Sequence, residues 1–74
     1  MIKEAELAFK QAYLLSPKNP ESVYRFTMFL IEHERVEEAQ RFVNAAAKLN
    51  QGNSYIRGLV DYVQSTVDST KHGR

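Results

Sequence analysis

The chain contains no cysteine, and this absence removes several kinds of site at once. Disulfide bridges and thiolate metal sites are excluded, so the fold must be held together by packing alone. The two histidines, His33 and His72, lie far apart in the sequence. No pair of ligands therefore stands at the spacing of a few residues that a metal site requires. We expect neither a metal nor a cofactor.

An excess of charge of one sign is also lacking. Ten basic and nine acidic residues give a formal net charge of +1, whereas a nucleic-acid binder usually carries a basic stripe. No apolar run approaches the ~20 residues that a membrane-spanning helix needs, and no signal segment opens the chain. We therefore expect a soluble domain that neither enters a membrane nor binds nucleic acid, and we favour the cytoplasm as its compartment.

Catalytic arrangements are missing as well. His33 stands beside Glu34 in a polar turn, where no third group would orient it against a nucleophile. Glu37 and Glu38 are adjacent on a predicted helix, and adjacent side chains point about 100° apart, so these carboxylates cannot converge. The three glycines stand alone and form no phosphate-binding loop. The sequence indicates a protein that is not an enzyme.

What the chain does contain is a series of amphipathic segments. Its 74 residues allow one domain, and a hydrophobic content of 43% favours a folded chain. Apolar residues recur at helical spacing, and two prolines, a polar turn and Gly52 separate the segments. The spacing predicts a domain of residues 1–68 with a flexible tail at 69–74, and its helices are expected at about 2–15, 20–33, 36–50 and 54–67.

Each predicted helix has one apolar face that is expected to point into the core. Short connections make neighbouring helices antiparallel. Gly58 weakens the fourth helix by roughly 1 kcal/mol relative to alanine. The expected inward residues are Ala5, Ala8, Phe9, Ala12 and Leu15; Val23, Phe26, Thr27, Phe29 and Leu30; Ala39, Phe42, Val43, Ala46 and Leu49; and Ile56, Leu59, Val60, Val63 and Val67.

A shift of 34 residues superposes the first predicted helix on the third. In both copies the matched positions carry alanine, a larger apolar residue and alanine again, which is the mark of an internal repeat. The matched pairs are Ala5 with Ala39, Phe9 with Val43, and Ala12 with Ala46.

This pattern resembles the tetratricopeptide repeat. The spacing Ala5-x-x-x-Phe9-x-x-Ala12-x-x-x-x-Pro17 is similar to the second helix of that repeat, and Val36-Glu37-Glu38-Ala39 to the start of such a helix. Two features depart from the family, because Gln51 replaces the usual proline and the turn at 33–35 lacks the usual glycine. The first helix of the repeat is matched by segment 20–33 through Val23, Phe26, Thr27 and Leu30.

The resemblance implies an all-α fold in which antiparallel helix pairs stack as a short right-handed solenoid of four helices. It covers about one and a half repeats and a fourth helix that acts as a C-terminal cap. Because each repeat shares its core with its neighbours, we expect the chain to be a fragment of a larger protein.

The resemblance also implies a protein–protein interaction module, a scaffold or adaptor that binds a peptide or partner domain in a concave groove. The family's chaperone-tail binders use a lysine and asparagine clamp, which is absent because Tyr24 and Met28 occupy its places. An alternative is that Tyr24 and Ile31 only complete the core. The expected groove residues are Glu21, Tyr24, Met28 and Ile31 of the second helix and Arg57, Asp61 and Gln64 of the fourth.

Leu7 and Leu14 are expected to form a separate apolar contact patch on the first helix. At the shift of 34, the equivalent residues of the third helix are the charged Arg41 and Lys48. They either pack on a preceding helix of a longer protein or mediate a homodimer through the first helix. A purely structural or self-association module is therefore an alternative function. RNA binding by a pentatricopeptide-like repeat is a further alternative, which the net charge of +1 disfavours.

Overall fold

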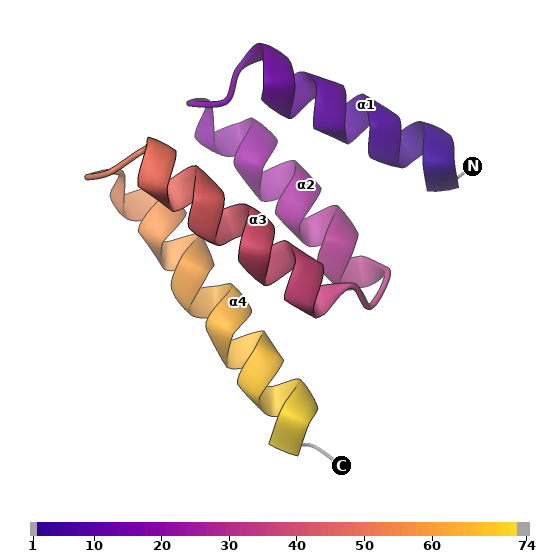
Figure 1. The fold of residues 1–74 in the computed structure, drawn as a ribbon, viewed down its shortest axis with the longest axis vertical. Helices are drawn as coiled ribbons and strands as arrows, with labels where there is room; N and C mark the ends of the chain where they lie inside the picture. The colour runs from indigo at the N-terminus through magenta and orange to yellow at the C-terminus, as the bar shows by residue number, and fades with distance from the viewer. Residues whose placement is uncertain (1, 73–74) are drawn as a thin grey trace.

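The computed structural model describes residues 2–72, and these form four helices without a strand. Figure 1 shows the helices side by side, with α1 and α2 antiparallel, α3 against α2, and α4 diverging toward the C-terminus. The predicted all-α fold of four helices is confirmed. The bounds are α1 (Ile2–Leu15), α2 (Pro20–Glu32), α3 (Val36–Leu49) and α4 (Ser54–His72).

Local hydrogen bonds fix the start of α2. The side-chain oxygen of Asn19 accepts a hydrogen bond from the backbone N–H of Glu21 at 3.0 Å. Pro20 occupies the first helical position, where no N–H donor is needed. The Ser22 hydroxyl donates to the carbonyls of Ser16 and Asn19, both at 2.9 Å. These contacts satisfy polar groups in the turn and explain why one helix ends and the next begins within a few residues.

The end of α4 differs from the sequence-based expectation. The sequence predicts that the helix ends at Val67 and that a tail begins at residue 69, yet α4 continues to His72. At the start of this extension, Asp68 accepts a hydrogen bond from the Gln64 side chain at 3.1 Å. No proline or glycine interrupts the chain between Gly58 and Gly73, so nothing local stops the helix. Residues 73 and 74 of the predicted tail lie outside the described residues.

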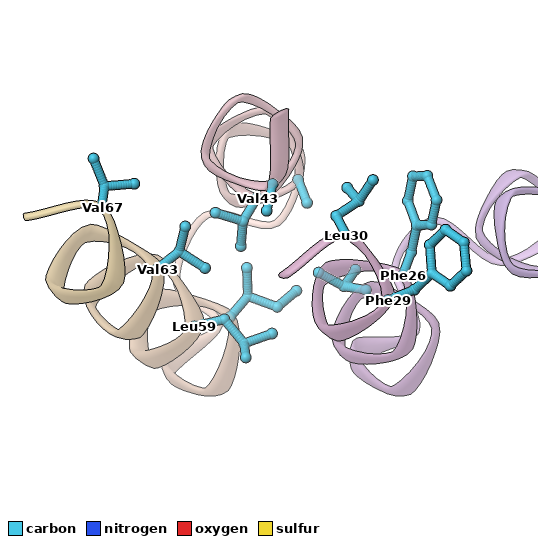
Figure 2. Packing of buried hydrophobic residues seen from close by; sticks show 11 residues of the cluster. Phe26, Phe29, Leu30, Val43, Leu59, Val63 and Val67 are labelled. Carbon is cyan, nitrogen blue, oxygen red and sulfur yellow. The ribbon is translucent and has the colours of Figure 1, made fainter. Parts of the chain in front are cut away.

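The core lies where α3 covers the seam between α2 and α4. Figure 2 shows Leu30 of α2 and Val63 of α4 pointing toward α3, with Val43 facing them. Ala39 and Ala46 of α3 are fully buried. Their small side chains let the backbone of α3 approach its neighbours closely, while the larger residues fill the space beside them.

An aromatic cluster attaches α1 to this core. The Tyr13 and Phe26 rings both meet Phe42 of α3 edge-on, with centroids 4.8 Å apart. Phe9 packs on Phe29 of α2 at 5.5 Å. Edge-to-face and tilted arrangements are the geometries that aromatic rings prefer. The cluster therefore holds three helices together at one place.

Some residues that were expected to point inward lie at the surface. Leu15 is 84% exposed and Leu49, its equivalent at the shift of 34, is 49% exposed. Ala8 and Ala12 are also exposed. Among the described helices only α2 lies close to the backbone of α1, and the flank of α1 that carries these residues has no helix against it. The apolar pattern of one helix does not show which of its apolar residues another helix will cover.

The turn between α2 and α3 places Glu34 in the left-handed region of backbone conformation, with φ of 62°. A side chain is strained there, and glycine is not. The turn is held by backbone hydrogen bonds from Glu34 to Ile31 at 2.9 Å and from Arg35 to Leu30 at 2.8 Å. The glycine that the sequence lacks at this turn is therefore replaced by a strained glutamate.

We predict that Glu34→Gly raises the free energy of unfolding by about 1 kcal/mol, because it removes this strain. Gly52→Ala is the matched control and is expected to destabilise the chain, because Gly52 has φ of 90°. Urea denaturation followed by circular dichroism measures both. A Glu34→Gly variant no more stable than the original chain would contradict the prediction.

Candidate interaction surface

Two of the expected groove residues line a hollow between α1 and α2. Tyr24 and Met28 of α2 face it together with Phe9 of α1, and its volume is about 220 Å³. Arg25 and Glu32 form its polar rim. Tyr24 is 39% exposed and Met28 is half-buried, so both present apolar surface that a partner could cover.

The expected residues of α4 lie elsewhere. Arg57 and Asp61 line a second hollow, of about 440 Å³, with Asn44 and Lys48 of α3. Gln64 accepts a hydrogen bond from the Gln40 side chain of α3 at 2.6 Å. This flank of α4 is therefore turned toward α3 and carries charged and amide side chains.

The remaining two expected residues have partners within the chain. Glu21 forms an ion pair with Arg25 at 2.9 Å, in which both side chains are well exposed. Ile31 is half-buried and packs against the core cluster. The seven expected residues thus line two separate hollows and their edges among the described residues, and the structure does not bring them together in one cleft.

The repeat itself explains this division. Tyr24 lies on the flank of α2 that faces α4, as its contact with Tyr55 shows. The flank of α4 that corresponds to it in the next repeat carries Arg57 and Asp61. Because successive repeats are related by a translation, this flank of α4 faces away from α2. Residues that are equivalent in two repeats therefore face in the same direction and cannot face each other.

Tyr55 is the residue of α4 that meets Tyr24. Their ring centroids lie 6.4 Å apart at an interplanar angle of 49°, and Tyr55 is 49% exposed. Tyr62, seven residues further along the same flank of α4, is 48% exposed. Sequence reasoning missed both residues. The available signal was two tyrosines seven apart, outside the apolar stripe of α4.

Arg35 is a second residue whose role the sequence did not indicate. Its guanidinium donates two hydrogen bonds to Glu6 of α1, at 3.0 and 2.7 Å, and two to Glu38 of α3, both at 2.9 Å. The Glu6 contact joins groups 29 residues apart in the chain. Hydrogen bonding from Arg35 lowers the pKa of both carboxyls below their ordinary value. This clamp fixes α1 against the turn that precedes α3.

The two leucines of the patch on α1 are both exposed. Leu7 is 55% and Leu14 66% exposed, and the two side chains lie on one face of the helix because they are seven residues apart. Leu15 borders them. Exposed leucines at this density on one helix are a feature of contact surfaces.

Other kinds of site find no support among the described residues. No three His, Cys or acidic side chains come close enough to hold a metal ion. The His33 ring packs on Phe29 with centroids 4.4 Å apart. None of the described helices combines the length and the apolar character needed to cross a bilayer.

Comparison with known families identifies the fold. Residues 1–61 match the family described as tetratricopeptide repeat, and the chain belongs to that family. Proteins built from this repeat generally act as protein–protein interaction modules and are typically not enzymes. No curated protein and no solved structure matches the chain significantly.

We predict a pH-dependent contribution of the Glu6–Arg35–Glu38 clamp to stability. Because the folded-state pKa values of both carboxyls are lowered, the clamp acts fully above the unfolded-state pKa of about 4.3 and is lost as pH falls through the folded-state values. Glu6→Gln should therefore lower Tm at pH 7, and its difference from the original chain should shrink below about pH 4.

Glu37→Gln serves as the control, because Glu37 is exposed on α3 next to Glu38 and forms no ion pair with Arg35. Its Tm should stay close to that of the original chain at every pH. A Tm difference for Glu6→Gln that is constant from pH 7 to pH 3 would contradict this account of the clamp.

Proposed function

We propose that this tetratricopeptide-repeat chain is a scaffold or adaptor module that binds a peptide or a partner domain on the exposed face of α2, from the hollow beside α1 to the contact with α4. The binding surface comprises Tyr24, Met28 and Ile31 of α2 together with Tyr55 of α4. Arg57, Asp61 and Gln64 lie on the other flank of α4, beside α3, and are left out of this surface.

The observation that carries the proposal is the exposed pair Tyr24 and Tyr55. Both tyrosines are partly exposed although their rings contact each other, and the hollow lined by Tyr24 and Met28 opens beside them. Aromatic side chains with a polar tip are enriched where proteins bind one another, and methionine adapts to partners of different shape. A half-covered aromatic pair next to an apolar hollow is the chemistry that such a surface requires.

A double substitution tests this surface. Tyr24→Ala with Met28→Ala is expected to weaken binding of short synthetic peptides, selected from a panel of acidic, basic, amphipathic and proline-rich sequences, by at least about tenfold. Fluorescence anisotropy of labelled peptides gives the affinities, and circular dichroism verifies that the helices remain.

The matched control is Glu37→Ala with Arg41→Ala, two exposed residues of α3 at the same spacing of four. Its affinities should equal those of the original chain. If both double variants lose the same peptide affinity, or if neither loses any, the α2 surface is not the binding surface.

Self-association through α1 is a second candidate function, and the exposure of Leu7 and Leu14 favours it. In an antiparallel pairing with a second copy, Leu7 would meet Leu14 and Leu14 would meet Leu7. The contact is therefore self-complementary, as a two-fold dimer requires.

Solution mass tests this candidate. Sedimentation equilibrium of the original chain is expected to show a concentration-dependent dimer, and Leu7→Glu is expected to remain monomeric because it would bury an unpaired charge. Ala12→Glu, which places the same charge at an exposed position on another side of the same helix, is the control and should still dimerise. A monomer at all concentrations in every variant would eliminate the dimer.

A further inference from the structure

The flank of α4 that faces α2 carries no formal charge. Its exposed members are two tyrosines with a glycine between them, followed by serine and threonine, whereas Arg57, Asp61 and Asp68 lie on the other flank. We call the surface made by Tyr24 of α2 and by Tyr55, Gly58 and Tyr62 of α4 the tyrosine face. Tyrosine, serine and glycine are the residues that antibodies use most in their contact surfaces.

The spacing along the tyrosine face suits one kind of peptide. Tyr55 and Tyr62 are seven residues apart on a helix, which separates them by about 10.5 Å along its axis. A polyproline II helix advances about 9.3 Å in one turn of three residues. Residues at positions i and i+3 of such a peptide can therefore reach the two tyrosine rings in succession. The Tyr24 ring, 6.4 Å from Tyr55, adds a second wall at one end.

Gly58 supplies an independent indication. It lies three residues after Tyr55 and four before Tyr62, so it shares their flank. A β-carbon at this position would meet no atom within 4 Å. Nothing inside the molecule requires glycine here, although glycine weakens a helix relative to alanine. A partner backbone that passes close to α4 between the two rings would require it.

The chemistry of a proline-rich segment matches the surface. A polyproline II helix has no internal hydrogen bonds, so its carbonyls are available to the tyrosine hydroxyls as acceptors. Its proline rings are apolar and dock between aromatic side chains. An acidic or basic peptide would find no opposite charge on this flank of α4.

We propose that the tyrosine face binds a proline-rich segment in the polyproline II conformation. This proposal rests on the proposed interaction function and names the class of partner for that surface. Tyr55 and Tyr62 contact successive turns of the segment, Tyr24 closes one side, and Gly58 leaves room for the segment between the rings.

The test titrates the full chain into fluorescein-labelled decaproline and follows fluorescence anisotropy. We expect saturable binding that weakens by at least about tenfold in Tyr55→Ala and in Tyr62→Ala. Tyr62→Phe should weaken binding less, because it removes only the hydroxyl. Arg57→Ala, on the other flank of α4, is the matched control and should leave the affinity unchanged.

Gly58→Ala separates binding from folding. It should raise Tm, because alanine favours the helix, and it should weaken decaproline binding several-fold because its methyl group occupies the space between the rings. A variant that is more stable and binds less cannot have lost binding through unfolding. Unchanged affinity in Gly58→Ala would overturn the assignment of the segment to this place.

The outcomes also distinguish this proposal from the one on which it rests. Absence of saturable decaproline binding overturns the present proposal. If acidic or amphipathic peptides still bind and still depend on Tyr24 and Met28, the interaction function stands without it. If the affinity for decaproline is unchanged in Tyr55→Ala and Tyr62→Ala, the assignment of the binding site to the tyrosine face is likewise overturned.

Discussion

The close contact of α3 with α2 and α4 is the constraint on which the rest of the structure depends. Ala39 and Ala46 are fully buried there, and their small side chains let three helix backbones share one core. None of the helices could bury its apolar face alone. Larger residues at these two positions would force the helices apart, because well-packed cores leave no space for added volume.

This packing also determines what the molecule presents to a partner. The rotation of α4 about its axis is set by its buried stripe, from Ile56 to Val67. Once that stripe faces α3 and α2, the tyrosines of α4 must lie on the flank next to Tyr24, and the charged residues must lie on the other. The division of α4 into an uncharged and a charged flank is thus a consequence of core packing.

Much of the fold could be predicted from the sequence because its signals are local. Pro17, Asn19 and Pro20 mark a helix boundary by their own chemistry, and the alanine pattern at a shift of 34 identifies the repeat. The extension of α4 to His72 was missed because polar residues were read as a tail although no helix-breaking residue stands there. The sequence shows that the turn at 33–35 lacks the usual glycine. It does not show that Glu34 is the residue that takes the strained left-handed conformation.

The candidate surface was less predictable, because it depends on how two distant helices are turned toward each other. Tyr24 and Met28 were assigned to a groove through the repeat, and they line a hollow between α1 and α2. Arg57 and Asp61 were assigned by the same translation and lie beside α3 instead. The pairing of Tyr24 with Tyr55, and the hydrogen bonds of Arg35 to Glu6 and Glu38, join residues that no short-range pattern connects.

The most direct test of this account is whether Tyr24 and Tyr55 touch in solution. Nuclear Overhauser measurements on the full chain should show cross-peaks between the protons of these two rings, since their centroids lie 6.4 Å apart. Cross-peaks between Tyr13 and Phe42, at 4.8 Å, serve as the internal reference. If the reference cross-peaks are present and those between Tyr24 and Tyr55 are absent, α2 and α4 do not form the proposed surface.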